Sequence, residues 1–242
     1  MTGAARERGI GRGIAECLAD EGCDVAINDV GAADEAAALV AELQGLGRRA
    51  AFYPADVSDR AAVDAMIEAV EAELGPIDIV CSNAGVADWQ GFLDVTEESF
   101  DRLVSVNLTG AFNVCQAAAR SMVDGGRPGK IVVTSSVHVQ MPFGEMSVYG
   151  ATKAGLKGMV ETMAIELAPY GITVNHIGPG WVRSFINDSS PSLQTDEEVA
   201  ATLELIPAGR PAEPRCVPDS APAFDRRSAF APLAKRDRAD RF

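Results

Sequence analysis

The sequence has few of the side chains that mark binding to nucleic acids or to membranes. Only 6% of its 242 residues are aromatic, and its 21 lysines and arginines are outnumbered by 35 aspartates and glutamates. The resulting net charge of −14 disfavours nucleic acid and anionic lipid, because both are negatively charged themselves. We therefore expect neither a nucleic acid nor a membrane as a partner.

The sequence also lacks a cysteine framework and long apolar runs. Its five cysteines, at positions 17, 23, 81, 115 and 216, have neither the spacing of a metal site nor the even number of a disulfide framework. No apolar run approaches the length of a membrane span, and no signal peptide opens the chain. These absences predict reduced thiols, no metal, and a soluble cytoplasmic protein.

The composition that is present predicts a large core. A chain of 242 residues with 47% hydrophobic content can bury one extensive core, and α/β chains of this length often form a single domain.

Residues 131–158 contain the most informative pattern. The β-branched run at 131–134 predicts a buried strand, which ends at Ser135 and Ser136. From Tyr149 the apolar spacing becomes helical, so Tyr149 and Lys153 lie one turn apart on the same helix face. A serine hydroxyl that faces a tyrosine with a lysine beside it is suited to proton transfer.

Residues 2–11 are a glycine-rich turn that leads into a helix predicted to end near Asp20. Such a turn lets the backbone approach a pyrophosphate, and the helix N-terminus offers free N–H groups. A strand at 25–29 follows and ends at Asp29, whose carboxylate suits the ribose diol of NAD and repels the extra phosphate of NADP. Asp29 could equally cap the next turn, and Arg6 and Arg8 keep NADP open.

The spacing of Ser136 and Tyr149 resembles the short-chain dehydrogenase/reductase family, in which a serine is followed thirteen residues later by Tyr-x-x-x-Lys. Residues 82–85, Ser-Asn-Ala-Gly, and 106–110, Val-Asn-Leu-Thr-Gly, also resemble that family, and the likeness extends over residues 2–213. It implies an α/β fold, namely a Rossmann-like doubly wound parallel sheet in a three-layer αβα arrangement.

The resemblance also implies the site and its chemistry, which is NAD(P)-linked interconversion of a secondary alcohol and a ketone. Tyr149 is then the acid/base, Lys153 lowers its pKa, Ser136 orients the substrate, and Asn107 supports a proton relay. A free tyrosine has a pKa of about 10, so such a base needs roughly 4 kcal/mol of stabilisation at pH 7. The implied cofactor contacts are Gly3, Gly9, Ile10, Gly11, Asp29, Asp56, Val57, Asn83, Ala84, Gly85, Tyr149, Lys153, Pro179, Gly180, Val182 and Ser184.

The substrate remains open between two enzyme classes. His138 follows Ser136 in a loop where the family often contacts substrate, and together with residues 177–180 this segment resembles the family's glucose dehydrogenases. We expect Ser136, His138 and Tyr149 to contact substrate, with His138 recognising a sugar or polyol hydroxyl. The alternative is a 3-oxoacyl-thioester reductase. A lone loop histidine can also be an incidental polar residue.

Both ends of the chain depart from the family pattern. Five residues rather than three separate Gly3 from Gly9, and only Met1 precedes Thr2, so we expect the family's first strand to be absent. Residues 214–242 carry seven basic and four acidic side chains, a net +3, against −17 for the first 213 residues. We expect a domain over 1–213, without the family's last strand, and a disordered or frameshifted tail over 214–242. The family's usual tetramer is then in doubt, and an inactive truncated copy that binds no cofactor is a third reading.

Overall fold

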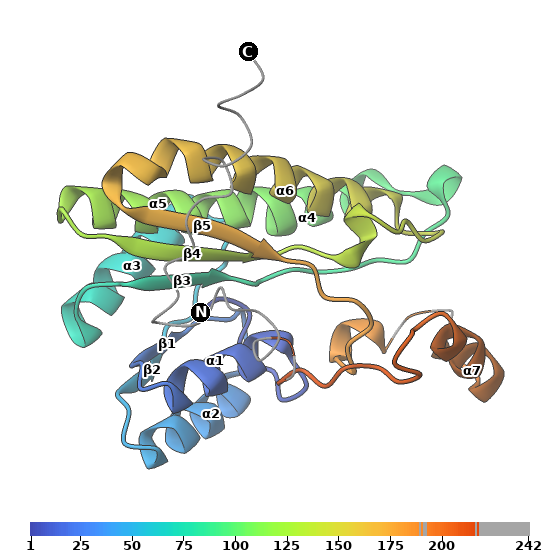
Figure 1. Ribbon diagram of the computed structural model, residues 1–242, viewed down its shortest axis with the longest axis horizontal. Helices are drawn as coiled ribbons and strands as arrows, with labels where there is room; N and C mark the ends of the chain where they lie inside the picture. The colour runs from blue at the N-terminus through green and yellow to red at the C-terminus, as the bar shows by residue number, and fades with distance from the viewer. Residues whose placement is uncertain (189, 191–192, 216, 218–242) are drawn as a thin grey trace.

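The computed structural model describes residues 1–188, 190, 193–215 and 217 as a three-layer α/β fold (Figure 1). Its strands are β1 (Val25–Ile27), β2 (Ala50–Phe52), β3 (Ile79–Ser82), β4 (Gly129–Thr134) and β5 (Ile172–Ile177). Its α-helices are α1 (Ile10–Asp20), α2 (Ala33–Gly45), α3 (Arg60–Leu74), α4 (Glu97–Val104), α5 (Ala111–Asp124), α6 (Ser147–Leu167) and α7 (Asp196–Glu204). The predicted α/β class is confirmed.

All strand pairs are parallel, as the alternation of strands and helices along the chain requires. One sheet has the order β3-β4-β5 and the other pairs β1 with β2. In the central strand β4, Ile131 and Val133 are completely buried, because helices cover both faces of a parallel sheet and leave its strands continuously apolar.

The helices form two layers. Helices α4, α5 and α6 cover one face of the strands, and α1 and α2 cover the other (Figure 1). One core cluster packs α3, α5 and α6 on the strands through side chains such as Val114 and Leu156, and a second packs α1 and α2 through Ile14 and Leu39.

Residues 1–4 lie between the two sheets, where the sequence predicted an absent strand. The Met1 ammonium donates to the Ala26 carbonyl over 2.9 Å, and the Met1 carbonyl accepts from the Asn28 N–H over 2.9 Å. On the other side, the Thr2 N–H donates to the Cys81 carbonyl over 3.1 Å. The remaining length of β1 faces that of β3 across a cavity of about 350 Å³. Residues 1–4 thus join the strands at their carboxyl ends, where the site lies.

The helical region of residues 97–124 is divided around Asn107. A π-helical segment, Ser105–Gly110, separates α4 from α5. At its end, a Cβ on Gly110 would lie 2.6 Å from the Val57 Cγ2 atom, so the absence of a side chain there permits close packing. Single π-helical turns are frequent at functional sites, and this one contains Asn107.

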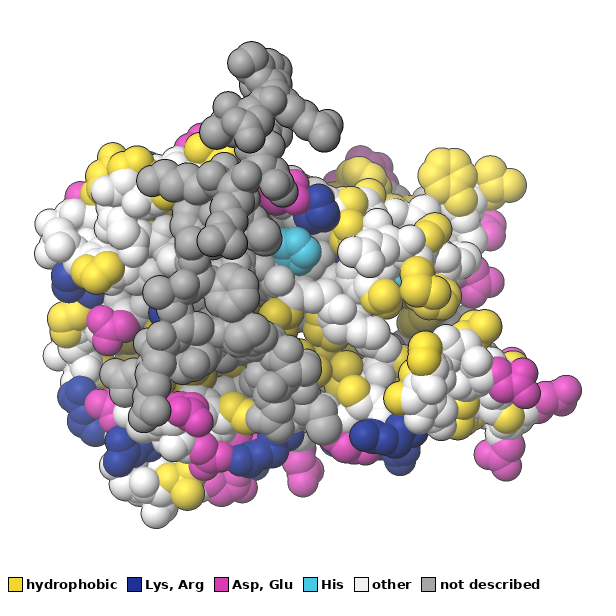
Figure 2. Space-filling model, viewed as in Figure 1, with side chains coloured by type: hydrophobic (Ala, Val, Ile, Leu, Met, Phe, Trp, Pro, Cys, Tyr) yellow, Lys and Arg dark blue, Asp and Glu magenta, His cyan; other side chains and the backbone are white. Residues whose placement is uncertain are grey.

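The last described residues pack against α1. A Cβ on Gly13 would lie 2.7 Å from the Pro214 backbone, the Arg215 guanidinium pairs with Asp20, and Val217 is buried in the second core cluster. Charged side chains are dense along this lower edge of the molecule, around α1 and α2 (Figure 2). Packing therefore continues beyond residue 213, while the rest of the predicted tail and the expectation for the last strand concern residues outside the described ones.

None of the helices in the described part of the chain is both long enough and apolar enough to cross a membrane.

Candidate active site

A cavity of about 960 Å³ opens at the carboxyl ends of the strands, where parallel α/β sheets commonly bind ligands. It brings together residues from the glycine-rich turn, from the loops after every strand, and from α6. Of the residues that the sequence predicted for the site, all except Gly11 and Asn107 line this cavity.

Ser136, Tyr149 and Lys153 meet as the sequence predicted. Ser136 follows β4, while Tyr149 and Lys153 lie one turn apart in α6. The Ser136 side chain lies near enough to Tyr149 to affect its pKa, and the Lys153 Nζ atom lies 5.6 Å from the centre of the Tyr149 ring. The Lys153 ammonium also donates to the Thr134 carbonyl over 3.0 Å, which fixes the lysine against the end of β4.

Burial is the main cause of the shifted pKa values of Lys153 and Tyr149. It lowers the pKa of Lys153 to about 8 because an ammonium is poorly solvated in the interior. Burial raises the pKa of Tyr149, while the neighbouring Ser136 side chain acts in the opposite direction. A raised pKa opposes the predicted role of Tyr149 as a base. A positive charge nearby would lower that pKa, and the Lys153 ammonium, which is protonated at pH 7, is such a charge.

Asn107 is completely buried behind this group. Its Oδ1 atom accepts from the Val86 N–H over 2.8 Å, and its Nδ2 atom donates to the Val86 carbonyl over 2.9 Å and to Thr152 Oγ1 over 3.2 Å. A Cβ on Gly85 would lie 3.3 Å from both Asn107 Oδ1 and Lys153 Nζ. A side chain at residue 85 would therefore crowd both of these polar atoms.

The glycine-rich turn is held by the segment after β3. Asn83 Nδ2 donates to the carbonyls of Thr2 and Gly3 over 3.2 and 3.1 Å, and Thr2 Oγ1 accepts the N–H groups of Asn83 and Ala84. A Cβ on Gly11 would overlap the Gly3 carbonyl oxygen. The turn therefore tolerates no side chain there, and the N-terminus of α1 opens onto the cavity, as a pyrophosphate site requires.

The two extra residues in this turn point outward. Glu7 and Arg8 are exposed. The Arg8 guanidinium binds both carboxylate oxygens of Asp188, and the Arg6 guanidinium lies 5.4 Å from the centre of the Phe185 ring. No local pattern in the sequence predicts these contacts, because Arg8 and Asp188 lie 180 residues apart in the chain.

Asp29 has two backbone donors. Its Oδ2 atom accepts from the Ala5 N–H over 3.0 Å, and its Oδ1 atom accepts from the Val30 N–H over 2.8 Å. Each carboxylate oxygen has a further lone pair, so the capping role and the predicted ribose contact are compatible. Arg6 lines the same cavity.

The segment after β5 contributes Pro179, Gly180, Val182 and Ser184 to the cavity lining. The Ser184 Oγ atom is buried and has no hydrogen-bond partner within the described residues. A buried hydroxyl without a partner is costly, so a polar group bound in the cavity would satisfy it. This hydroxyl, together with the glycine-rich turn, fits a dinucleotide.

His138 lies beside the reactive group. Its ring centre is 5.5 Å from that of Tyr149 and 4.7 Å from that of Phe143, and burial lowers its pKa. The imidazole is therefore neutral at pH 7, with one donor and one acceptor nitrogen. Sequence reasoning missed Phe143 and Trp89, which also line the cavity, because neither lies in a periodic segment.

Comparison with known proteins gives consistent matches. The family model described as Enoyl-(Acyl carrier protein) reductase matches residues 3–223. The L-2,3-butanediol dehydrogenase of Corynebacterium glutamicum is 39% identical over 183 residues, which cover 75% of this chain and 70% of that protein. A 3-oxoacyl-[acyl-carrier-protein] reductase of Staphylococcus aureus is 37% identical over 210 residues (87% and 82%).

Two further proteins extend this comparison. The L-rhamnose 1-dehydrogenase (NAD(P)(+)) of a Sphingomonas species is 37% identical over 213 residues, which cover 87% of this chain and 83% of that protein. The crystal structure of a short-chain type dehydrogenase/reductase from Mycobacterium marinum superposes with a TM-score of 0.78 at 34% identity, covering 88% of this chain and 81% of that one.

Proposed function

The chain belongs to the short-chain dehydrogenase/reductase family, and on that premise we propose that it interconverts a secondary alcohol and a ketone with Tyr149 as the acid/base. As a member of that family it is an NAD(P)-dependent oxidoreductase. The observation that carries the proposal is the cluster of Ser136, Tyr149 and Lys153 in the cavity lining, in which Lys153 lies 5.6 Å from the centre of the tyrosine ring.

In the oxidation direction, the Ser136 hydroxyl and the Tyr149 phenolate would hold the hydroxyl of the substrate alcohol. When bound, the nicotinamide cofactor accepts the hydride that leaves the carbinol carbon. The phenolate, which the Lys153 ammonium stabilises, takes the hydroxyl proton and becomes a neutral phenol. In reduction the neutral Tyr149 donates its proton to the carbonyl oxygen, and the Lys153 ammonium stabilises the negative charge that develops on the phenol oxygen. Asn107 supports the proton relay by holding the Val86 backbone, which follows Gly85.

The cofactor would lie along the cavity that the glycine-rich turn and Ser184 both line. The N–H groups at the start of α1, next to Gly9, Ile10 and Gly11, would hold the pyrophosphate. The Ser184 hydroxyl, which lacks a partner within the described residues, would hold the carboxamide of the nicotinamide. Asp29 would accept from the adenosine ribose, and the segment with Asp56 and Val57 would contact the adenine.

We infer NAD as the preferred cofactor because Asp29 lines the cavity and its carboxylate repels the extra phosphate of NADP. The nearby Arg6 guanidinium, which has only the Phe185 ring as its described partner, is the feature that would favour NADP.

A polyol or sugar is the substrate class that His138 favours. A neutral imidazole beside Tyr149 can hydrogen-bond a hydroxyl on the carbon next to the reacting one, as in a vicinal diol. The relatives named for butanediol and rhamnose act on such compounds. The alternative, a 3-oxoacyl-thioester reductase, is favoured by the aromatic lining at Trp89 and Phe143 and by the relative named for that activity.

Steady-state kinetics separate the two substrate classes. We expect turnover of 2,3-butanediol or an aldose with NAD⁺ to exceed reduction of an acetoacetyl thioester with NADPH. Replacing His138 by alanine should lower kcat/KM for polyols and leave it unchanged for a simple secondary alcohol such as 2-butanol. Equal losses on both substrates would contradict polyol recognition by His138. Turnover of neither class, with either cofactor, would contradict the proposed reaction.

A further inference from the structure

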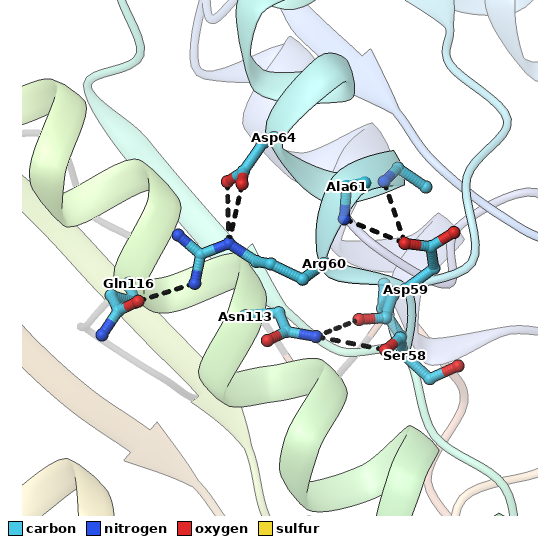
Figure 3. Close-up of polar contacts among 9 residues, drawn as sticks. Ser58, Asp59, Arg60, Ala61, Asp64, Asn113 and Gln116 are labelled. Carbon is cyan, nitrogen blue, oxygen red and sulfur yellow. Dashed lines mark hydrogen bonds and ion pairs between the residues drawn. The ribbon is translucent and has the colours of Figure 1, made fainter.

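Two buried asparagines hold one short segment of backbone, residues 53–58, from opposite sides. Asn28, which follows β1 and is 3% exposed, donates from Nδ2 to the carbonyls of Tyr53 and Ala55, both over 3.0 Å. Asn113, in α5 and 5% exposed, donates from Nδ2 to the carbonyls of Val57 and Ser58 over 3.0 and 3.4 Å. Figure 3 shows the Asn113 amide directed at this turn.

These bonds leave one hydrogen-bond acceptor and one donor of the segment available to a ligand. The carbonyl of Asp56 accepts from the Asp59 N–H over 3.1 Å, and Asp56 Oδ1 accepts from the N–H and hydroxyl of Ser58. Within the described residues, Asp56 Oδ2 and the Val57 N–H have no hydrogen-bond partner, and both residues line the large cavity. A carboxylate acceptor beside an N–H donor matches the edge of adenine, whose amino group donates and whose ring nitrogen accepts.

The placement of this pair depends on the tethers. The segment leaves β2 after the Tyr53 N–H donates to the Ile27 carbonyl over 2.8 Å. Beyond that bond it is a loop that leads to α3, so side-chain donors hold most of its carbonyls. Val57 also packs against Gly110, where a Cβ would lie 2.6 Å from Cγ2. Asn113 lies in the same helical run as Gly110 and Asn107, so this run both holds the segment and reaches the reactive group.

We propose that Asn28 and Asn113 are positioning residues for the adenine half of the cofactor. They act by clamping the backbone of residues 53–58 and contact neither the reacting atoms nor the nicotinamide. This inference rests on the proposed function, since it assumes an adenine dinucleotide in the cavity.

The chain offers a matched control one helical turn from Asn113. Gln116 Oε1 accepts from Arg60 over 2.6 Å, and Arg60 also binds Asp64, so this contact joins α5 to α3 without touching residues 53–58 (Figure 3). Its loss disturbs the same pair of helices and leaves the clamp intact.

The test compares fragments of the cofactor by calorimetry. In Asn113→Ala we expect AMP and NAD⁺ to bind about tenfold more weakly, the range for loss of one buried amide. Nicotinamide mononucleotide affinity and kcat at saturating cofactor should not change. Asn28→Ala should behave alike, whereas Gln116→Ala should lower Tm and leave AMP affinity unchanged. If the alanine variant does not fold, Asn113→Ser gives the same comparison. The serine hydroxyl is still a donor, but its side chain is too short to reach both carbonyls.

The outcomes distinguish the proposed role of Asn28 and Asn113 from the proposed function on which it rests. If the wild-type protein binds AMP and the folded Asn113 variants bind it equally well, the positioning role of Asn113 is contradicted, and the proposed oxidoreductase function is not. If AMP and nicotinamide mononucleotide weaken equally, or if Gln116→Ala weakens AMP as much as Asn113→Ala, the effect is general destabilisation and the clamp is again wrong. Failure of the wild-type chain to bind AMP, nicotinamide mononucleotide or a dinucleotide contradicts both.

Discussion

The Lys153 ammonium lies 5.6 Å from the centre of the Tyr149 ring and is anchored to the Thr134 carbonyl. At this separation, a unit positive charge stabilises a phenolate by about 3 kcal/mol if the effective dielectric constant is near 20. Such stabilisation lowers the pKa of Tyr149 and opposes the upward shift that burial imposes on it. The bound nicotinamide would add a second positive charge, and we propose that the lysine and the cofactor together make the tyrosine a usable base.

Removing the Tyr149 hydroxyl tests its role directly. In Tyr149→Phe the ring keeps its packing against His138, but no proton can be transferred, so kcat should fall by about 10² to 10⁴. Cofactor affinity, measured by NADH fluorescence, should remain within about twofold. Tyr170→Phe is the matched control, because that ring is exposed and outside the cavity lining. Retention of wild-type turnover by Tyr149→Phe would remove Tyr149 from the mechanism.

The buried lysine should reduce the stability of the protein below pH 8. Because its folded-state pKa is about 8 against 10.5 for an ordinary lysine, the unfolded state binds more protons between these values, and stability rises with pH across this window. The full penalty, about 3 kcal/mol, applies below pH 8. We expect Lys153→Met to be more stable than wild type by about 2 kcal/mol at pH 7, after loss of one hydrogen bond.

This stability difference should shrink as the pH approaches 10.5. Urea unfolding of both proteins at several pH values measures it, and the difference between them cancels other titrations that the two share. Lys157→Met, one turn further along α6 and partly exposed beside Glu161, should show no comparable gain. A Lys153→Met protein that is less stable than wild type, with a gap independent of pH, would show that burial does not penalise this charge.

The glycine-rich turn should not accept a side chain at residue 11. In Gly11→Ala the new methyl group would overlap the Gly3 carbonyl oxygen and lie 2.7 Å from Asn83 Nδ2. We expect a loss of about 1–3 kcal/mol in stability and at least a tenfold loss in dinucleotide affinity. Gly45→Ala, where no atom lies within 4 Å of the added Cβ, should leave cofactor affinity unchanged. Wild-type cofactor affinity in Gly11→Ala would place the pyrophosphate elsewhere.

Asp29 should select between the two dinucleotides. Loss of a hydrogen bond to a charged group is worth about 1.5–3 kcal/mol, so the ratio of NAD⁺ to NADP⁺ affinity should fall by about 10- to 100-fold in Asp29→Ala. The exposed Asp34→Ala changes net charge equally and should leave the ratio unchanged. Arg6→Ala should move the ratio toward NAD⁺. An unchanged ratio in Asp29→Ala would assign Asp29 only its observed bonds to the Ala5 and Val30 N–H groups.

The sequence predicted the parts of the site that depend on local patterns. Tyr149 and Lys153 share one helix face through their spacing, and Ser136 directly follows an apolar strand. The approach of Ser136 to Tyr149 was implied by the family resemblance and not by spacing. Strands β1 and β3 lie beside a cavity, and in the described part of the chain residues 1–4 connect them by backbone hydrogen bonds.

Contacts between distant segments could not be predicted in this way. The π-helical segment at Asn107 depends on Val86 and Thr152, which lie 21 and 45 residues away in the chain. The Asn113 tether spans 56 residues, and asparagine in a helix is by itself only an unfavourable helix former. Such roles follow from which carbonyls the folded chain leaves within reach.

The central claim is that the cavity binds a nicotinamide dinucleotide, and thermal unfolding of the 242-residue chain with and without NAD⁺ or NADP⁺ tests it most directly. A ligand at a hundred times its Kd stabilises the native state by about 2.7 kcal/mol. We predict a cooperative transition whose Tm rises with NAD⁺ and rises less with NADP⁺. A larger rise with NADP⁺ would reverse the assignment of Asp29. A Tm that neither dinucleotide moves, or the absence of any cooperative transition, would contradict the account as a whole.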